Sequence, residues 1–153
     1  MQKLSRSEFK LEHNLNSLFP ELKAFKNNLS LKKSSFYRQH GAEFERVANG
    51  IEYSNLIHDR PGSNRLRVVA WNIERGIKSS EIIRFIQSDP RLQETDVFLL
   101  TETDIGMGRS GNINVPAEIA TALDMNYCYA NSFLVLAKGD EGELTHESEY
   151  TLS

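Results

Sequence analysis

Two short apolar runs predict two buried β-strands in the second half of the chain. The first run covers residues 66–70 and the second covers residues 96–100. Apolar runs of this kind are typical of strands that are buried on both faces. Between them, the segment 79–81 can cap a helix, Ile82, Ile83, Phe85 and Ile86 lie at helical spacing and supply its buried face, and Pro90 follows the end of the helix. The order strand, helix, strand predicts an α/β fold.

The first 58 residues show only helical spacing. Apolar side chains recur at steps of three, four and seven, at positions 4, 11, 15 and 18, then 22, 25 and 29, then 44, 47 and 51. No part of this stretch is predicted to be a strand. The turn-rich segment 59–64 ends it. We therefore expect residues 1–60 to form a helical accessory segment, either packed on the sheet or used to bind a partner.

Each predicted strand ends in an oxygen-bearing side chain. Asn72 follows the first run and Glu102 follows the second, 30 residues later. Ligands of open α/β sheets gather just past the carboxyl ends of the strands, so the two side chains should lie close together. An amide oxygen beside a carboxylate suits a hard cation such as Mg²⁺, which prefers oxygen ligands and keeps positions for water and phosphate.

The same two segments carry a family resemblance. VVAWNIERG followed by DVFLLTETDIGMGRSGN resembles the endonuclease/exonuclease/phosphatase superfamily, whose first strand ends in a (F/W)N pair and whose second ends in a (Q/T)E pair. The resemblance covers about residues 66–133. It implies the DNase I-like fold, a four-layer α/β sandwich, and Mg²⁺- or Mn²⁺-dependent hydrolysis of phosphate esters. The implied substrates are nucleic acid, lipid phosphate or sugar phosphate.

The resemblance and the residue chemistry together give each candidate site residue a role. Glu102 is expected to hold the metal, and Asn72 either touches the metal or orients the phosphate and the carboxylate. Asp104 lies two residues beyond Glu102 and is a candidate supporting acid. Arg109 and Asn112 lie in a glycine-rich loop, where a guanidinium suits bidentate phosphate contact. The alternative for Arg109 is a surface ion pair, with Asp104 as the candidate partner.

The remaining pattern predicts a helix and a third strand. Pro116 suits the first turn of a helix, and residues 127–137 read as a strand in the same sheet as the first two. Residues 66–153 would supply only the first half of the superfamily domain. The Asp-His pair that the resemblance leads us to expect is not found, so we expect an incomplete, poorly active fragment that a C-terminal half would complement. An apolar sheet face should then be exposed unless the N-terminal helices cover it.

The distribution of charged residues limits the kinds of partner that we expect the chain to bind. Residues 1–65 contain 11 Lys and Arg against 7 Asp and Glu, whereas residues 66–153 contain 7 against 14. The acidic second half disfavours a DNA-tracking nuclease. No apolar run is long enough to span a bilayer, and the single cysteine, Cys128, indicates a reducing compartment such as the cytoplasm. The alternative function is a non-enzymatic interaction module that uses the basic N-terminal helices.

Overall fold

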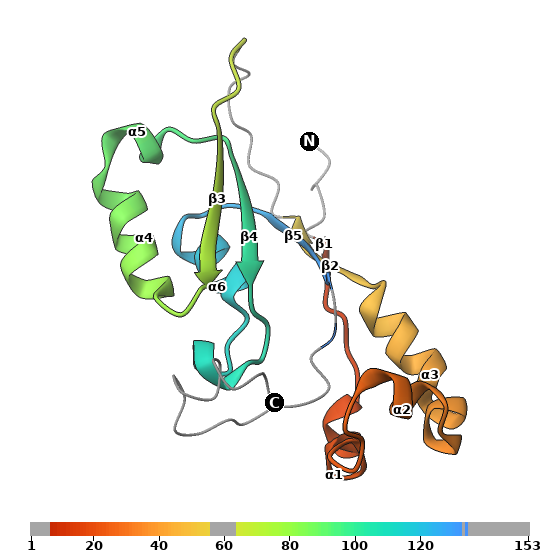
Figure 1. Cartoon of the computed structure of the whole chain (residues 1–153). Coiled ribbons are helices and arrows are strands. Elements are labelled where there is room, and N and C mark those ends of the chain that lie inside the picture. Colours follow the sequence, from red (N-terminus) through yellow and green to blue (C-terminus); the bar gives the residue numbers. More distant parts are fainter. Residues whose placement is uncertain (1–6, 56–63, 133, 135–153) are drawn as a thin grey trace.

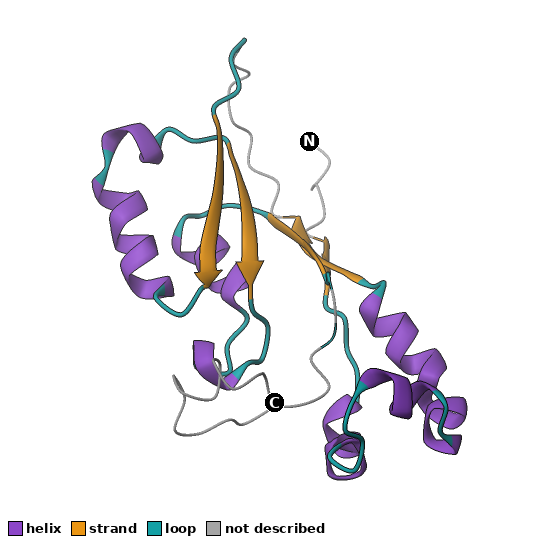
Figure 2. Cartoon of the chain, viewed as in Figure 1, coloured by secondary structure: helices purple, strands orange, loops and turns teal. Residues whose placement is uncertain are grey.

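Residues 7–55, 64–132 and 134 are described by a computed structural model and form two small sheets with flanking helices (Figures 1 and 2). One sheet is the parallel pair β3 (Val68–Arg75) and β4 (Val97–Thr103). The other is antiparallel, in the order β1 (Ser7–Phe9), β2 (Ile51–Asn55) and β5 (Tyr127–Ala130). The predicted fold class, α/β, is confirmed.

The strand–helix–strand unit forms as its sequence pattern predicts. Helices α4 (Ser79–Ser88) and α5 (Pro90–Gln93) connect β3 to β4, and α6 (Val115–Ala122) follows β4. The core consists of β3, α4 and α6 side chains, namely Ile73, Ile82, Ile86, Val115 and Ile119. Pro116 lies in the first turn of α6, as expected. Phe85, which the helical spacing assigns to the buried face of α4, is instead 50% exposed.

The turn after β3 depends on a glycine. Glu74, Arg75 and Gly76 have φ angles of 49°, 63° and 72°, in the left-handed region that L-residues with side chains rarely adopt. A Cβ atom added at Gly76 would lie 2.4 Å from Cγ1 of Val115, which is itself fully buried. The turn therefore needs glycine both for its backbone angle and for its close packing on α6.

The N-terminal helices form their own core and do not cover the β3–β4 sheet. They are η1 (Leu15–Leu18), α1 (Phe19–Leu22), α2 (Asn28–Lys32) and α3 (Ser35–Ala48). Their buried side chains are Leu15, Leu22, Leu31, Phe44 and Val47. No helix within the described ranges is long and apolar enough to cross a bilayer.

One face of the β3–β4 sheet stays open. Trp71 and Phe98 point toward the helices and pack on their core, whereas Val68 and Leu99 are 48% and 56% exposed. The expectation of an exposed apolar sheet face is confirmed at these positions. Single exposed apolar side chains are common on protein surfaces. A contiguous group of them forms a surface through which proteins associate.

Two expectations about strands are wrong. The N-terminal segment is not helical throughout, because β1 and β2 lie within it and Ile51 begins β2. The third strand joins β2 in antiparallel pairing, with Glu52 opposite Tyr129, and does not share the β3–β4 sheet. It ends at Ala130, while residues 133 and 135–137 of the expected strand lie outside the described residues. Residues on both sides of the expected boundary at 60–66 thus share one sheet.

The pattern of β2 is hard to recognise because its buried residue is a glutamate. Glu52 is 7% exposed, whereas its neighbours Ile51 and Tyr53 are 52% and 38% exposed. This reverses the usual arrangement of apolar residues inside and polar residues outside. A buried carboxylate is stable only if hydrogen-bond donors replace water around it.

Three parts of the chain supply hydrogen-bond donors to the Glu52 carboxylate. The backbone N–H of Leu11 donates to Glu52 Oε2 at 3.3 Å, and the Tyr127 hydroxyl donates to Oε1 at 2.7 Å. The side-chain amide of Asn114, which also caps α6, donates to the same Oε1. The carboxylate therefore ties the N-terminal segment, β5 and the start of α6 to one atom group.

Burial and the adjacent carboxylate of Glu52 raise the pKa of Tyr127 above its usual value. The folded state thus holds this phenol proton more tightly than the unfolded chain does. The resulting stabilisation is complete below pH about 10, and it is lost as the pH rises through the raised pKa.

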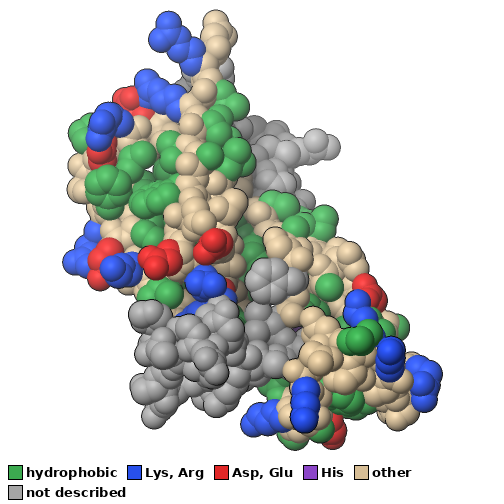
Figure 3. Space-filling view, viewed as in Figure 1, with side chains coloured by type: hydrophobic (Ala, Val, Ile, Leu, Met, Phe, Trp, Pro, Cys, Tyr) green, Lys and Arg blue, Asp and Glu red, His purple; other side chains and the backbone are tan. Residues whose placement is uncertain are grey.

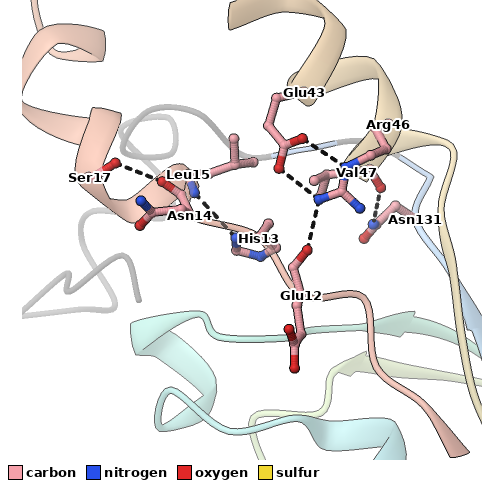
Figure 4. Close-up of polar contacts among 9 residues, drawn as sticks. All are labelled: Glu12, His13, Asn14, Leu15, Ser17, Glu43, Arg46, Val47 and Asn131. Carbon is pink, nitrogen blue, oxygen red and sulfur yellow. Dashed lines mark hydrogen bonds and ion pairs between the residues drawn. The ribbon is translucent and has the colours of Figure 1, made fainter.

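A second set of hydrogen bonds joins the N-terminal segment and β5 to α3 (Figure 4). Arg46 donates to the backbone carbonyl of Glu12 at 2.7 Å and pairs with Glu43 on its own helix. The amide of Asn131, just after β5, donates to the carbonyl of Val47 at 2.9 Å. These contacts fix the helical unit against the antiparallel sheet.

We expect Glu52→Ala to lower the free energy of unfolding by about 3 kcal/mol, because it leaves three buried or half-buried donors without an acceptor. The measurement is urea unfolding followed by circular dichroism. The matched control is Glu45→Ala, since Glu45 also accepts a tyrosine hydroxyl, that of Tyr37, but on the surface. It should have little effect. Equal effects of the two substitutions would contradict the role assigned to Glu52.

Candidate functional site

Asn72 and Glu102 lie in direct contact on neighbouring parallel strands. The Nδ2 atom of Asn72 donates a hydrogen bond to Oε1 of Glu102 at 2.8 Å. The strand pairing brings them together, since Asn72 is opposite Thr101, one residue before Glu102. The expected meeting of these two side chains at the carboxyl end of the sheet is therefore confirmed. Both side chains are exposed.

The amide of Asn72 has a defined orientation. Its Oδ1 accepts a hydrogen bond from the backbone N–H of Glu74 at 3.0 Å, so its NH₂ group faces Glu102. An amide that presents its NH₂ group cannot ligate a cation through the same contact. Of the two roles expected for Asn72, this geometry favours orienting the carboxylate over touching a metal directly.

The backbone at Glu102 is strained. Its φ angle is 53°, in the left-handed region, although it lies inside β4. The pairing of β3 with β4 is also irregular here, between Asn72 and Arg75. A glutamate in this conformation costs about 1–2 kcal/mol relative to an ordinary strand backbone. Strain of this kind is characteristic of residues held for a function.

The donor set at Glu102 fits a water-rich Mg²⁺ or Mn²⁺ site. Oε1 is held by Asn72, and within the described part of the chain Oε2 has no hydrogen-bond partner. Magnesium is commonly bound through one or two carboxylates, with water and phosphate completing its shell. The described residues contain no group of three or more His, Cys, Asp or Glu side chains placed to hold a metal. The fit is thus to a single-carboxylate site.

Asp104 and Arg109 form a buried ion pair. Nε and Nη2 of Arg109 donate to the two carboxylate oxygens of Asp104 at 2.7 and 2.9 Å. The side chains are only 7% and 9% exposed, and Ser110 also donates to Asp104 at 3.2 Å. Of the alternatives for Arg109, the structure shows the pairing with Asp104, although it is buried and not on the surface. Asp104 thus accepts hydrogen bonds from Arg109 and from Ser110 in the loop.

The glycine-rich loop is closed at its base and exposed at its tip. Ile105 and Asn114 form an antiparallel bridge, and the short helix η2 (Gly108–Ser110) follows inside the loop. Asn112 lies at the exposed tip with a φ angle of 58°, and its N–H donates to the Met107 carbonyl at 2.9 Å. Phosphate binding by Asn112 and Arg109 remains a prediction from the sequence.

Glu102 borders a cleft of about 1060 Å³ between β4, β5 and the segment before α1. Tyr127, Tyr129 and His13 also line it. None of these three residues was predicted from the sequence as a site residue, because the pairing of β5 with β2 has no signal in the sequence. Burial raises the pKa of Tyr129, as do the negative charges of Asp104 and Glu52.

His13 does not form a catalytic dyad in this arrangement. Its Nδ1 accepts a hydrogen bond from the backbone N–H of Leu15 at 3.4 Å, which places the proton of a neutral ring on Nε2 (Figure 4). His40, the other histidine in the described residues, packs on the ring of Phe36. Neither histidine has a hydrogen bond to an aspartate. His58 and His146 lie outside the described residues.

The protein is thus an α/β protein in which two neighbouring parallel strands end in a hydrogen-bonded asparagine and glutamate. Comparison with protein-family models, with curated proteins and with solved structures gave no match. The resemblance to the endonuclease/exonuclease/phosphatase superfamily therefore rests on the residues themselves.

We expect Arg109→Ala to lower the free energy of unfolding by about 3 kcal/mol, because it leaves Asp104 buried without its counter-ion. Thermal and urea unfolding would measure the loss. The control is Arg84→Ala, which removes an arginine whose ion pair with Glu81 is exposed on both sides, at 74% and 62%. It should change stability little. An Arg109→Ala variant as stable as the control would contradict a structural role for the pair.

We expect Glu102→Gly to raise the free energy of unfolding by about 0.5 kcal/mol, because relief of backbone strain exceeds the loss of one exposed hydrogen bond. Glu102→Gln keeps the strain and should bring no gain. Asp124→Gly, at a φ angle of 51° after α6, is the control for relief of strain away from the site. If Glu102→Gly is less stable than Glu102→Gln, the left-handed backbone at Glu102 does not cost the free energy that we assign to it.

Proposed function

We propose that this chain carries the metal-binding part of a phosphate-ester hydrolase of the endonuclease/exonuclease/phosphatase type, with a DNase I-like arrangement. The observation that carries the proposal is the contact between Asn72 and Glu102 at the carboxyl ends of two parallel strands. The motif pair in the sequence and the exposed, oriented carboxylate support the same function. The substrate class is a phosphodiester or phosphomonoester.

Glu102 would hold Mg²⁺ or Mn²⁺ through its carboxylate, with Asn72 fixing the rotamer of that carboxylate. The bound cation would supply Lewis-acid stabilisation of the phosphoryl oxygens. The contribution of Asn72 is positional, since its NH₂ group holds Oε1 while Glu74 N–H holds its own oxygen. Arg109 steadies the loop beside the site through Asp104.

The hydrolysis step also needs a general base to take a proton from the attacking water, and loss of such a base costs about 10²–10⁴-fold in rate. The two histidines in the described part of the chain are not placed as one, because neither is paired with an aspartate. We therefore propose that these 153 residues bind the metal but hydrolyse phosphate esters poorly.

A second candidate is a non-enzymatic interaction module. The observation that favours it is the separate core of η1, α1, α2 and α3, which makes the N-terminal helices a unit of their own. Metal binding distinguishes the two candidates. A catalytic remnant should bind a divalent cation through Glu102, whereas a pure interaction module has no need of one.

We expect the protein to bind Mn²⁺, measured by the loss of the free Mn²⁺ signal in electron paramagnetic resonance. Glu102→Gln should abolish the binding, because it removes the charge while keeping the shape. Asn72→Ala should weaken it about 10-fold, as loss of an orienting partner does. Glu94→Gln is the matched control, since Glu94 is an exposed acid before the other end of β4.

The same variants should be assayed with a bis-aryl phosphodiester, with and without EDTA. We expect little turnover. Unchanged Mn²⁺ binding by Glu102→Gln would overturn the metal assignment. Strong, EDTA-sensitive turnover by the unmodified chain would show that it contains a base beyond the residues assigned here.

A further inference from the structure

Exposed basic side chains outnumber acidic ones over α1, α2 and the first half of α3. Residues 19–42 contain five Lys and Arg but one acidic residue, Glu21. All five basic side chains are exposed, namely Lys23, Lys26, Lys32, Lys33 and Arg38. We call this set the basic patch. Figure 3 shows blue Lys and Arg side chains spread over the surface of α1, α2 and α3.

An exposed leucine lies within the basic patch. Leu29 is 63% exposed, more than most large apolar side chains of the described residues. Lys32, the last residue of α2, and Lys33, its C-cap in helical conformation, follow Leu29 by three and four positions, so all three lie on the same side of the helix. Leu31, between them in sequence, points the other way into the core. The outer side of α2 therefore combines an apolar side chain with two ammonium groups.

The charges of the basic patch are not neutralised by neighbouring acids. Within the described residues, Lys26, Lys32 and Lys33 form no ion pair. Further along α3, by contrast, Arg46 is paired with Glu43 at 2.7 Å. Uncompensated lysines around an exposed leucine have a positive potential that favours an anionic partner.

We propose that the basic patch, together with the exposed Leu29, binds the surface of an anionic phospholipid membrane. Clustered lysines are attracted to anionic headgroups, and an apolar side chain among them inserts into the headgroup boundary. Four of the five basic residues are lysines. A lysine ammonium group is a compact point charge suited to general attraction to a charged surface, whereas bidentate recognition of nucleic acids is typical of arginine.

The aromatic residues of this unit also favour the membrane over single-stranded nucleic acid. Phe25, Phe36 and Tyr37 pack against the helical core, so their faces are not arranged as a platform for bases. The basic patch lies on elements that do not contribute Glu102. Membrane binding therefore does not depend on the metal site or on the proposed hydrolysis.

The test is co-sedimentation of the full chain with vesicles of phosphatidylcholine alone and of phosphatidylcholine mixed with phosphatidylserine. We expect binding only to the mixed vesicles and release at high salt, because salt screens surface charge. Each lysine contributes about fivefold to the partition coefficient. Lys32→Ala/Lys33→Ala should thus reduce it about 30-fold, and Leu29→Ser should also weaken binding.

The matched control is Lys78→Ala/Arg84→Ala, which removes the same charge from the exposed start and middle of α4. Its binding should equal that of the unmodified chain. Circular dichroism should show that all variants are folded. The proposal is overturned if the mixed vesicles do not bind, if the two double variants lose binding equally, or if a single-stranded RNA binds the patch more tightly than the vesicles do.

Discussion

The buried carboxylate of Glu52 is the constraint on which the arrangement of the chain depends. One side chain accepts hydrogen bonds from the segment before η1, from β5 and from the residue that caps α6. These partners lie 41, 75 and 62 residues away in sequence. Apolar contacts alone do not specify which groups meet, because the hydrophobic effect has no direction, whereas a hydrogen bond requires a particular donor and acceptor. Through Tyr127, the cluster also joins β5, which forms one wall of the cleft beside Glu102.

The two charged features near the cleft have opposite characters. Asp104 and Arg109 are buried, satisfied by each other and joined to the loop, which is the environment of a structural pair. Glu102 is exposed, held by one amide and kept in a strained backbone conformation. An exposed carboxylate that is oriented and strained contributes little to stability. This arrangement is the observation on which the proposed divalent-cation site rests, since carboxylate oxygens suit a hard cation.

The sequence predicted the parts of the fold that are local. The β3–α4–β4 unit and the start of α6 near Pro116 follow from apolar runs, helical spacing and the chemistry of single residues. The contact between Asn72 and Glu102 was also predictable, because parallel neighbours end at the same edge of a sheet.

The parts that depend on distant partners were not predictable. The strand β2 has a glutamate at its buried position, so its pattern reverses the usual one and reads as the end of a helix. The antiparallel partner of β5 is this same strand. The pairing of Arg109 with Asp104 was one of the predicted alternatives, but its burial beside the closed base of the loop was not. In each case a polar group is buried because of donors or charges that lie elsewhere in the chain.

The central claim is that Glu102, oriented by Asn72, holds a divalent cation. The most direct measurement is an anomalous difference map from a crystal of the protein grown or soaked with Mn²⁺. We predict a peak within about 2.2 Å of a Glu102 carboxylate oxygen, with water in the remaining positions. A well-ordered Glu102 without a peak, while Mn²⁺ is bound elsewhere in the same crystal, would contradict the account.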